Sequence, residues 1–183
     1  MQISEYISGH HYALCICEGR AEEDLINYLL DHDRLIFKRS DLIFGKVTRS
    51  RGVKKIQDEY LSLDFEKPVF IFRIVDSKNE RFKLDAAFEG RYSDKVFNII
   101  TRPEIEILII IKNNDYGAYT NRSKTKLKPS EYCQSAYKIK KIKSEGIFIN
   151  VFSNINELVK SIEEYKRLTG SREYNLSDIL SSF

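Results

Sequence analysis

The stretch HYALCICEGRAEEDLINYLL, residues 11–30, decides the expected fold because it joins an apolar run directly to an amphipathic segment. The run 11–17 has no polar face, as expected for a strand that is covered on both sides in a parallel sheet. In residues 21–33, apolar side chains recur at helical spacing, and acidic ones stand near the start, where the helix dipole favours them. A strand followed at once by a helix is the repeating unit of an α/β fold.

The same alternation continues along the chain. Strands are predicted at residues 41–47, 68–77, 95–101 and 145–153, and helices at 52–63, 155–170 and 175–183. The isoleucine-rich run 102–113 begins with a proline at a plausible first helical turn, but its composition suits a buried helix and a strand equally. The pattern predicts an α/β protein with an open, mostly parallel, Rossmann-like sheet flanked by helices, whose functional crevice lies at the carboxyl ends of the strands.

Length and composition favour one ordinary domain. The 183 residues are 42% hydrophobic, which is enough to form a core. We expect a single domain over residues 1–183, with a core at about 13–152 and C-terminal helices at 154–183. Neither a long uncharged apolar run nor an N-terminal signal pattern occurs, so we expect a soluble, cytoplasmic protein without a membrane partner. The odd count of three cysteines predicts reduced thiols in the core.

Basic residues concentrate in two segments, 46–55 and 122–143. Such segments can hold the phosphates of a nucleic acid electrostatically, without reading its sequence. The alternative is that the lysines only solvate exposed loops. The candidate nucleic-acid-binding residues are Arg49, Arg51, Lys54, Lys124, Lys126, Lys128, Lys138, Lys140 and Lys141. Four interleaved tyrosines would stack on unpaired bases or else pack in the core: Tyr116, Tyr119, Tyr132 and Tyr137.

Two carboxylates follow predicted strands, Glu18 after the first and Asp76 after the strand at 68–77. If these strands are neighbours in a parallel sheet, both acids leave the same edge and repel each other. A hard divalent cation such as Mg²⁺ relieves that repulsion, and it keeps water and phosphate ligands. The pair therefore suits phosphoryl chemistry. The alternative is structural: Glu18 caps a helix and Asp76 closes a turn.

These residues resemble a known family. ALCICEGRAEEDLINYLL is similar to the opening of a Toprim domain, the metal-binding module of topoisomerases, bacterial primases and overcoming-lysogenization-defect nucleases. Glu18 and Gly19 match its Glu-Gly pair, and Asp76 in FRIVDSKNE matches the first aspartate of its Asp-x-Asp element. TRPEIEILIIIKNNDYGAY and the following KLKPSEYCQSAYK resemble a Pro-x-x-Glu block and its lysine-rich continuation in small Toprim-like proteins of abortive-infection and restriction-linked phage defence. The resemblance covers roughly residues 13–137.

The resemblance implies a Toprim-type nuclease that uses Mg²⁺ or Mn²⁺. Glu18 would be the acid/base or metal-bridging residue, and Asp76 the main metal ligand. Lys78 stands where the family has its second aspartate, which removes one ligand. Glu22 or Glu106 would then supply the missing oxygen, or Lys78 would contact the scissile phosphate and take part in catalysis.

The resemblance also implies a biological role. The expected protein is a toxic effector of anti-phage defence that cleaves DNA or RNA. It would be controlled by a partner protein such as an ATPase. Assembly into a homo-oligomer is a further possibility. The alternative is a catalytically inactive Toprim-like module that binds nucleic acid or a partner protein as a sensor or regulator. The exchange of an aspartate for Lys78 favours that alternative.

Overall fold

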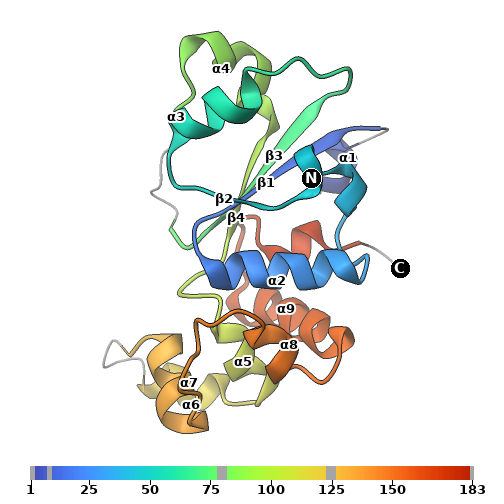
Figure 1. Cartoon of the computed structure of the whole chain (residues 1–183). Helices are drawn as coiled ribbons and strands as arrows, with labels where there is room; N and C mark the ends of the chain where they lie inside the picture. The colour runs from blue at the N-terminus through green and yellow to red at the C-terminus, as the bar shows by residue number, and fades with distance from the viewer. Residues whose placement is uncertain (1–2, 8–9, 78–81, 123–126, 182–183) are drawn as a thin grey trace.

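A computed structural model describes residues 3–7, 10–77, 82–122 and 127–181 of the chain. Within these residues a four-stranded parallel sheet has the order β2-β1-β3-β4 (Figure 1). The strands are β1 (Tyr12–Cys17), β2 (Thr48–Arg49), β3 (Val69–Val75) and β4 (Val96–Ile100). The predicted α/β architecture with an open parallel sheet is confirmed.

The two central strands are apolar because each is buried on both faces. On one face, Phe72 of β3 lies between Phe37 and Phe97, with ring centroids 4.6 and 5.7 Å away. On the other face, Leu14 of β1 and Ile71 of β3 belong to a second buried cluster. Side chains alternate between these two clusters along each strand, as the period of a strand requires.

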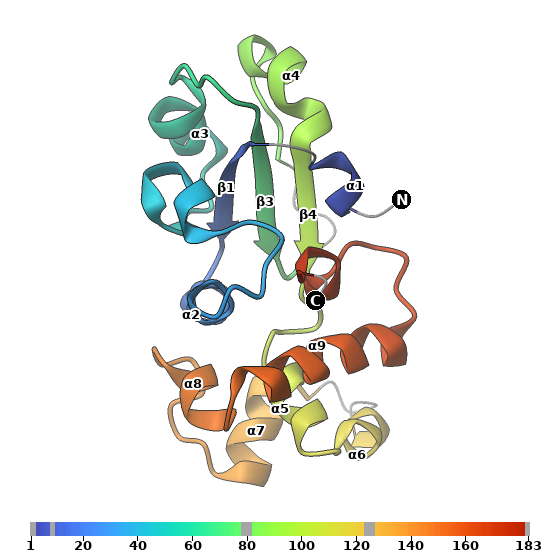
Figure 2. The ribbon, with the colours of Figure 1, turned by 90° about the vertical axis from the view of Figure 1, so that its right-hand side faces the viewer.

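Helices lie around the sheet and beyond its carboxyl edge. Their bounds are α1 (Ile3–Tyr6), α2 (Arg20–Asp31), α3 (Val53–Ile56), α4 (Ala86–Tyr92), α5 (Ile107–Lys112), α6 (Tyr116–Arg122), α7 (Pro129–Tyr137), α8 (Ile147–Val151) and α9 (Ile155–Thr169). Figure 2 shows the strand arrowheads pointing toward α2 and the helical layer α5–α9. One core cluster joins that layer to the sheet. None of the helices in the described part of the chain is long and apolar enough to cross a membrane.

The two long helices have clear boundaries. Gly19 is the N-cap of α2, and the predicted apolar positions Leu25 and Leu29 are fully buried. In α9, the side chain of Asn154 accepts a hydrogen bond from the backbone N–H of Glu157. Gly170 ends α9 with a φ of 56°, a left-handed conformation that glycine adopts at little cost. Both predicted helices are confirmed.

The strand predicted at 145–153 is wrong, because α8 occupies most of this segment. Ile147, Phe148 and Phe152 are buried, while Ile149 and Asn150 are exposed, which is a helical and not an alternating pattern. Gly146, with a φ of 75°, precedes the helix. The apolar run therefore packs one helical face onto the core, where α8 contacts α2.

The strand predicted at 41–47 is also wrong. Short 3₁₀ turns occupy Arg39–Asp41 and Ile43–Gly45, and the strand that follows them is only β2. Within the predicted strand, Leu42 forms an isolated bridge to Ala13. Positive φ angles of 57° at Phe44 and 64° at Gly45 turn the chain away from an extended path.

The segments at 52–63 and 102–113 are helical in part. The first contains α3 and one π-helical turn, Gln57–Leu61, with Ile56 and Tyr60 buried. The second contains α5, which begins at Ile107 and not at the proline. Ile107, Leu108, Ile109, Ile110 and Ile111 are all buried. A short helix that is apolar on every side is stable only when enclosed, and α6, α7 and α9 contact α5. The predicted tail helix is a 3₁₀ turn at Leu176–Ile179.

The cysteines and the central tyrosines belong to the core. All three cysteines are free and buried, which confirms reduced thiols. Tyr119 and Tyr132 are 5% and 3% exposed, and their rings meet edge to face. The hydroxyl of Tyr137 donates a hydrogen bond to Asp115 at 2.8 Å. These contacts confirm the packing role of Tyr119 and Tyr132 over base stacking.

Replacing Phe72 by alanine tests the aromatic stack between the sheet and its covering layer. Removal of this fully buried ring should lower the free energy of unfolding by about 3–5 kcal/mol. Urea unfolding followed by circular dichroism measures the loss. The control is Ile149→Ala, at an apolar side chain that is 55% exposed on α8, which should change stability by at most about 0.5 kcal/mol. Similar losses in both variants would contradict the packing described.

Candidate functional site

The acids that follow β1 and β3 meet at one edge of the sheet. β1 pairs with β3 in parallel register, with Cys17 opposite Ile74, so Glu18 and Asp76 leave neighbouring strands at the same end. Both line a cavity of about 290 Å³. The charged residues that line it are Glu18, Glu22, Asp76, Glu104, Glu106, Arg20, Arg51 and Lys143. All four predicted metal ligands are therefore gathered around one cavity.

The first turn of α2 presents Glu22 to this cavity. Because α2 starts at Arg20, Glu22 lies within one turn of Glu18. The carboxylate of Glu22 folds back onto Gly19, so a Cβ at that glycine would stand only 2.6 Å from Glu22 Oε2. The Glu-Gly pair thus combines a carboxylate at the strand end with space for a second carboxylate.

The connection between β4 and α5 contributes Glu104, which is firmly held. Its Oε2 accepts hydrogen bonds from the backbone N–H and the hydroxyl of Ser130, at 3.1 and 2.6 Å. Lys143 Nζ lies 3.4 Å from Glu104 Oε1. Burial raises the pKa of Glu104, but the Ser130 hydrogen bonds and the Lys143 charge outweigh it, and the pKa is lowered overall. Glu104 is therefore ionised at neutral pH.

Glu106, two residues further on, has the opposite character. It is only 2% exposed, and burial raises its pKa from 4.5 to about 7. A hydrogen bond from its own backbone and the charge of Lys143 favour the ionised form, while Glu104 and Glu22 oppose it. Two glutamates of one segment are thus driven apart in pKa, an arrangement typical of sites that exchange protons.

Glu18 has a buried oxygen that suits a cation. Its Oε1 is shielded from solvent and has no hydrogen-bond partner among the described residues. A buried carboxylate oxygen is costly without a partner, and a hard divalent cation would supply one. In the described residues no three His, Cys, Asp or Glu side chains are grouped so that they could hold a metal ion together. Mg²⁺ is usually held by one or two carboxylates plus water and phosphate oxygens, so the donor set fits it.

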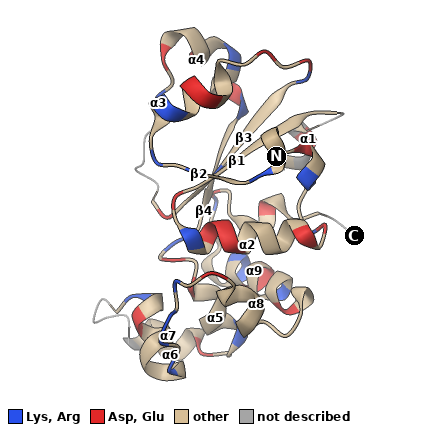
Figure 3. Cartoon of the chain, viewed as in Figure 1, with Lys and Arg blue, Asp and Glu red and all other residues tan. Residues whose placement is uncertain are grey.

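Three cationic groups face these carboxylates. Arg51 follows β2, Arg20 begins α2, and Lys143 comes from the turn between α7 and α8. Burial lowers the pKa of Lys143, but Glu104 and Glu106 outweigh it and raise the pKa overall, so the ammonium group is charged. Figure 3 shows basic and then acidic residues in the first turns of α2. The cavity therefore offers positive charge for an anion beside carboxylates for a cation.

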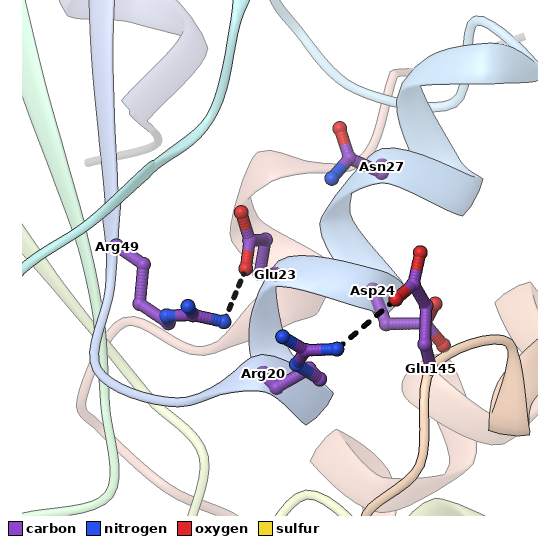
Figure 4. Close-up of a pocket in the computed structure, with 6 residues that line it drawn as sticks. All are labelled: Arg20, Glu23, Asp24, Asn27, Arg49 and Glu145. Carbon is purple, nitrogen blue, oxygen red and sulfur yellow. Dashed lines mark hydrogen bonds and ion pairs between the residues drawn. The ribbon is translucent and has the colours of Figure 1, made fainter.

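A second cavity, of about 250 Å³, lies on the neighbouring side of α2 and shares Arg20 with the first (Figure 4). Arg49 pairs with Glu23, and Arg20 with Glu145, at 3.0 Å each. The backbone N–H of Gly146 also donates to Asp24 at 2.7 Å. The contacts of Glu145 with Arg20 and of Gly146 with Asp24 join the turn before α8 to the start of α2, and this turn carries Lys143.

The predicted basic residues do not form one surface at the cavity. Arg51 lines it and Arg49 lines the neighbouring one, whereas Lys54, Lys128, Lys138, Lys140 and Lys141 are exposed and line neither. The predicted residues Lys78, Lys124 and Lys126 lie outside the described residues.

Four site residues were not selected from the sequence: Arg20, Glu104, Ser130 and Lys143. Glu104 stands inside the quoted Pro-x-x-Glu block, and Lys143 ends the second basic segment, so both had a local signal. Ser130 had none, because its role depends on α7 packing beside the β4–α5 connection.

No protein-family model, curated protein or solved structure matches the chain. Assignment to the Toprim family therefore stays a prediction from the sequence resemblance, and the function has to be argued from the cavity itself.

Glutamine substitutions at Glu106 and Glu104 should change the pH dependence of stability in opposite ways. The folded-state pKa of Glu106 is raised, so its contribution to stability is full below pH 4.5 and is lost as the pH rises through about 7. Glu106→Gln should therefore gain stability relative to the wild type across that window. The folded-state pKa of Glu104 is lowered, so Glu104→Gln should be most destabilised above pH 4.5.

Urea unfolding between pH about 4 and 8, with a chelator present, measures both differences. The two variants serve as each other's control, since the glutamates belong to one segment and differ mainly in burial and in the Ser130 contacts. Parallel pH profiles for the wild type and both variants would contradict the electrostatic description of the site.

Proposed function

We propose that the chain hydrolyses phosphodiester bonds of nucleic acid with the help of a divalent cation, Mg²⁺ or Mn²⁺, at the carboxyl edge of its sheet. The observation that carries the proposal is that Glu18, Glu22, Asp76 and Glu106 line one cavity together with Arg51. Carboxylates attract the cation, and arginine binds phosphate through a planar fork of donors. A bound cation would neutralise the charge that develops on the phosphate.

Glu18 and Asp76 are the residues best placed to hold the cation. They follow adjacent parallel strands, and Oε1 of Glu18 is a buried oxygen without a hydrogen-bond partner among the described residues. Glu22 lies one turn away on α2 and adds a third carboxylate at the same cavity. Lys143 and Arg51 face them and would bind the phosphate oxygens that the cation does not reach.

Glu106 suits the proton transfer that hydrolysis requires. A water oxygen forms a bond to phosphorus and gives up a proton to the solvent, the bond to the leaving oxygen breaks, and the leaving oxygen takes up a proton. Because burial raises the pKa of Glu106 to about 7, this carboxyl group is suited to exchange a proton near neutral pH, as general acid catalysis requires. A cation bound directly to Glu106 would favour its ionised form. Measuring the pKa of Glu106 with and without Mg²⁺ therefore distinguishes a general acid from a metal ligand.

A second candidate function is a binding module without turnover. Two observations favour it: Lys78 replaces an expected acidic ligand, and no three potential ligands among the described residues are grouped to hold a metal ion. Such a module would bind nucleic acid or a partner protein as a sensor or regulator. The role in anti-phage defence and the partner ATPase rest on the sequence resemblance alone.

Cleavage of labelled DNA, messenger RNA and transfer RNA pools tests the proposed function. We expect the wild type to cut at least one pool with Mg²⁺ or Mn²⁺ and not with a chelator. Glu18→Gln and Asp76→Asn should lower the rate about 100-fold or more, because each removes a charge from the cation site. The matched control is Glu66→Gln, at an exposed acid before the amino end of β3, which should cut like the wild type.

Calorimetric titration of the metal-free protein with Mn²⁺ gives a readout that does not depend on cleavage. Metal binding that is lost in Glu18→Gln and Asp76→Asn, but kept in Glu66→Gln, would support the cation site. Cutting that continues in the chelator, or that survives both substitutions, would rule out the proposed chemistry. Metal binding without cutting of any pool would favour the binding module over the nuclease.

Gly19→Ala tests whether Glu22 takes part. The new Cβ would meet only the end of the flexible Glu22 side chain, so the fold should tolerate it while the carboxylate moves. We expect an unchanged melting temperature and a cleavage rate lowered about 10- to 100-fold, since small displacements of reacting groups are costly. Gly90→Ala is the control, because Gly90 lies in α4, which does not line the cavity, and nothing stands within 4 Å of the Cβ that alanine would add there. Full activity in Gly19→Ala would exclude Glu22 from the site.

A further inference from the structure

Phe44 is an aromatic side chain displayed to solvent. It is 64% exposed, more than any other large hydrophobic residue that the structure describes. Its neighbours Leu42 and Ile43 are each 3% exposed and anchor the turn in the two different core clusters. With both core positions taken and its own φ at 57°, Phe44 points outward and does not fold back into the protein. Its ring lies beside that of Tyr60, with centroids 5.7 Å apart.

The segment that follows Phe44 carries only positive charge. Residues 42–57 contain no acid and five basic residues: Lys46, Arg49, Arg51, Lys54 and Lys55. Arg49 pairs with Glu23 and Lys55 with Glu59, whereas the other three make no ion pair with a described acidic residue. Figure 3 shows this charge at the start of α3 and on the chain that leads to it. An exposed aromatic ring beside basic side chains is the combination that binds unpaired nucleotides.

This basic segment reaches the candidate site at Arg51. Thr48 and Arg49 pair with Ile16 and Cys17 of β1, immediately before Glu18. Arg51 follows directly and lines the same cavity as Glu18 and Asp76. From Phe44 to Arg51 the chain spans at most about 25 Å. A strand whose phosphate is held at Arg51 is therefore within reach of the Phe44 ring a few nucleotides away.

We infer that residues 44–55 form a track for single-stranded nucleic acid, in which Phe44 stacks on an unpaired base and Arg51 delivers the backbone to the cavity. The inference rests on the proposed function, because it names the form of nucleic acid that the site would receive. In a duplex the base faces are covered by their neighbours, so a single exposed ring has no face to stack on. A single strand offers such a face at every base, whatever its sequence.

The test is binding of a short fluorescein-labelled oligonucleotide, as DNA and as RNA, each free or annealed to its complement. Fluorescence anisotropy in a chelator keeps binding separate from cleavage. We expect Phe44→Ala and Phe44→Leu to weaken single-strand binding about 5- to 100-fold, and Phe44→Trp to keep it, because leucine retains the apolar bulk without the aromatic face. The duplex should bind more weakly than the single strand and should not respond to these substitutions.

Two controls separate stacking from other effects. Ile149→Ala removes an exposed apolar side chain from α8 and should leave binding unchanged. Arg51→Ala should weaken binding of single strand and duplex alike and reduce its salt dependence, since it removes a phosphate contact. Melting temperatures of all variants show whether each is folded.

Three results would overturn the inference: no single-strand binding by the wild type, an unchanged affinity in Phe44→Ala, or equal losses for single strand and duplex in that variant. Failure of the proposed function looks different. If an oligonucleotide is bound through Phe44 but is never cut with Mg²⁺ or Mn²⁺, the inference of a single-strand track is supported and the proposed nuclease function is rejected. If cutting does not depend on Phe44, the proposed nuclease function is supported and the inference of a track is rejected.

Discussion

The parallel pairing of β1 with β3 is the constraint on which the rest of the site depends. With Cys17 opposite Ile74, the chain has to release Glu18 and Asp76 at the same edge of the sheet. Carboxylates brought together in this way repel each other, and Oε1 of Glu18 is also shielded from solvent and without a hydrogen-bond donor in the part of the chain that the structure describes. This electrostatic repulsion does not change the pairing, because both strands are buried on both faces and cannot shift register without exposing their apolar side chains.

Acidic and basic side chains lie side by side around this edge. Carboxylates from β1, β3, α2 and the β4–α5 connection surround the cavity, while Arg20, Arg51 and Lys143 stand among them. Tertiary contacts divide the roles of the glutamates. Ser130 and Lys143 keep Glu104 ionised, whereas burial raises the pKa of Glu106 to about 7. Groups that attract a cation, bind an anion and exchange a proton near pH 7 are thus present within one cavity, which is the physical basis of the proposed hydrolysis.

The sequence predicted strands and helices correctly where the spacing of apolar residues matches the face that the tertiary structure buries. The apolar strands β1, β3 and β4 and the amphipathic helices α2 and α9 were predictable because their periodicity records which face is buried. The strand predictions at 145–153 and 41–47 failed because short apolar runs fit either state, and contacts with distant elements select one. Around α8 that contact is with α2, and at Leu42 and Ile43 it is with the two core clusters.

The sequence by itself determined the parallel sheet, the place of Glu18 and Asp76 after two of its strands, and the candidacy of Glu22, Glu106 and Arg51. The sheet and the two strand-end acids follow from chain order, since residues that come directly after a parallel strand lie at its carboxyl end. Glu22 and Glu106 were candidates through the resemblance to Toprim domains, and Arg51 was a candidate through its basic segment. Only the tertiary structure decided that Glu104 is held by Ser130 and Lys143, and that Glu106 is buried beside them. Those residues come from α7, from the turn after it and from the start of α5. Nothing in a linear pattern states how closely separate elements pack, and it is that packing which fixes the local dielectric and the hydrogen bonds that set each charge.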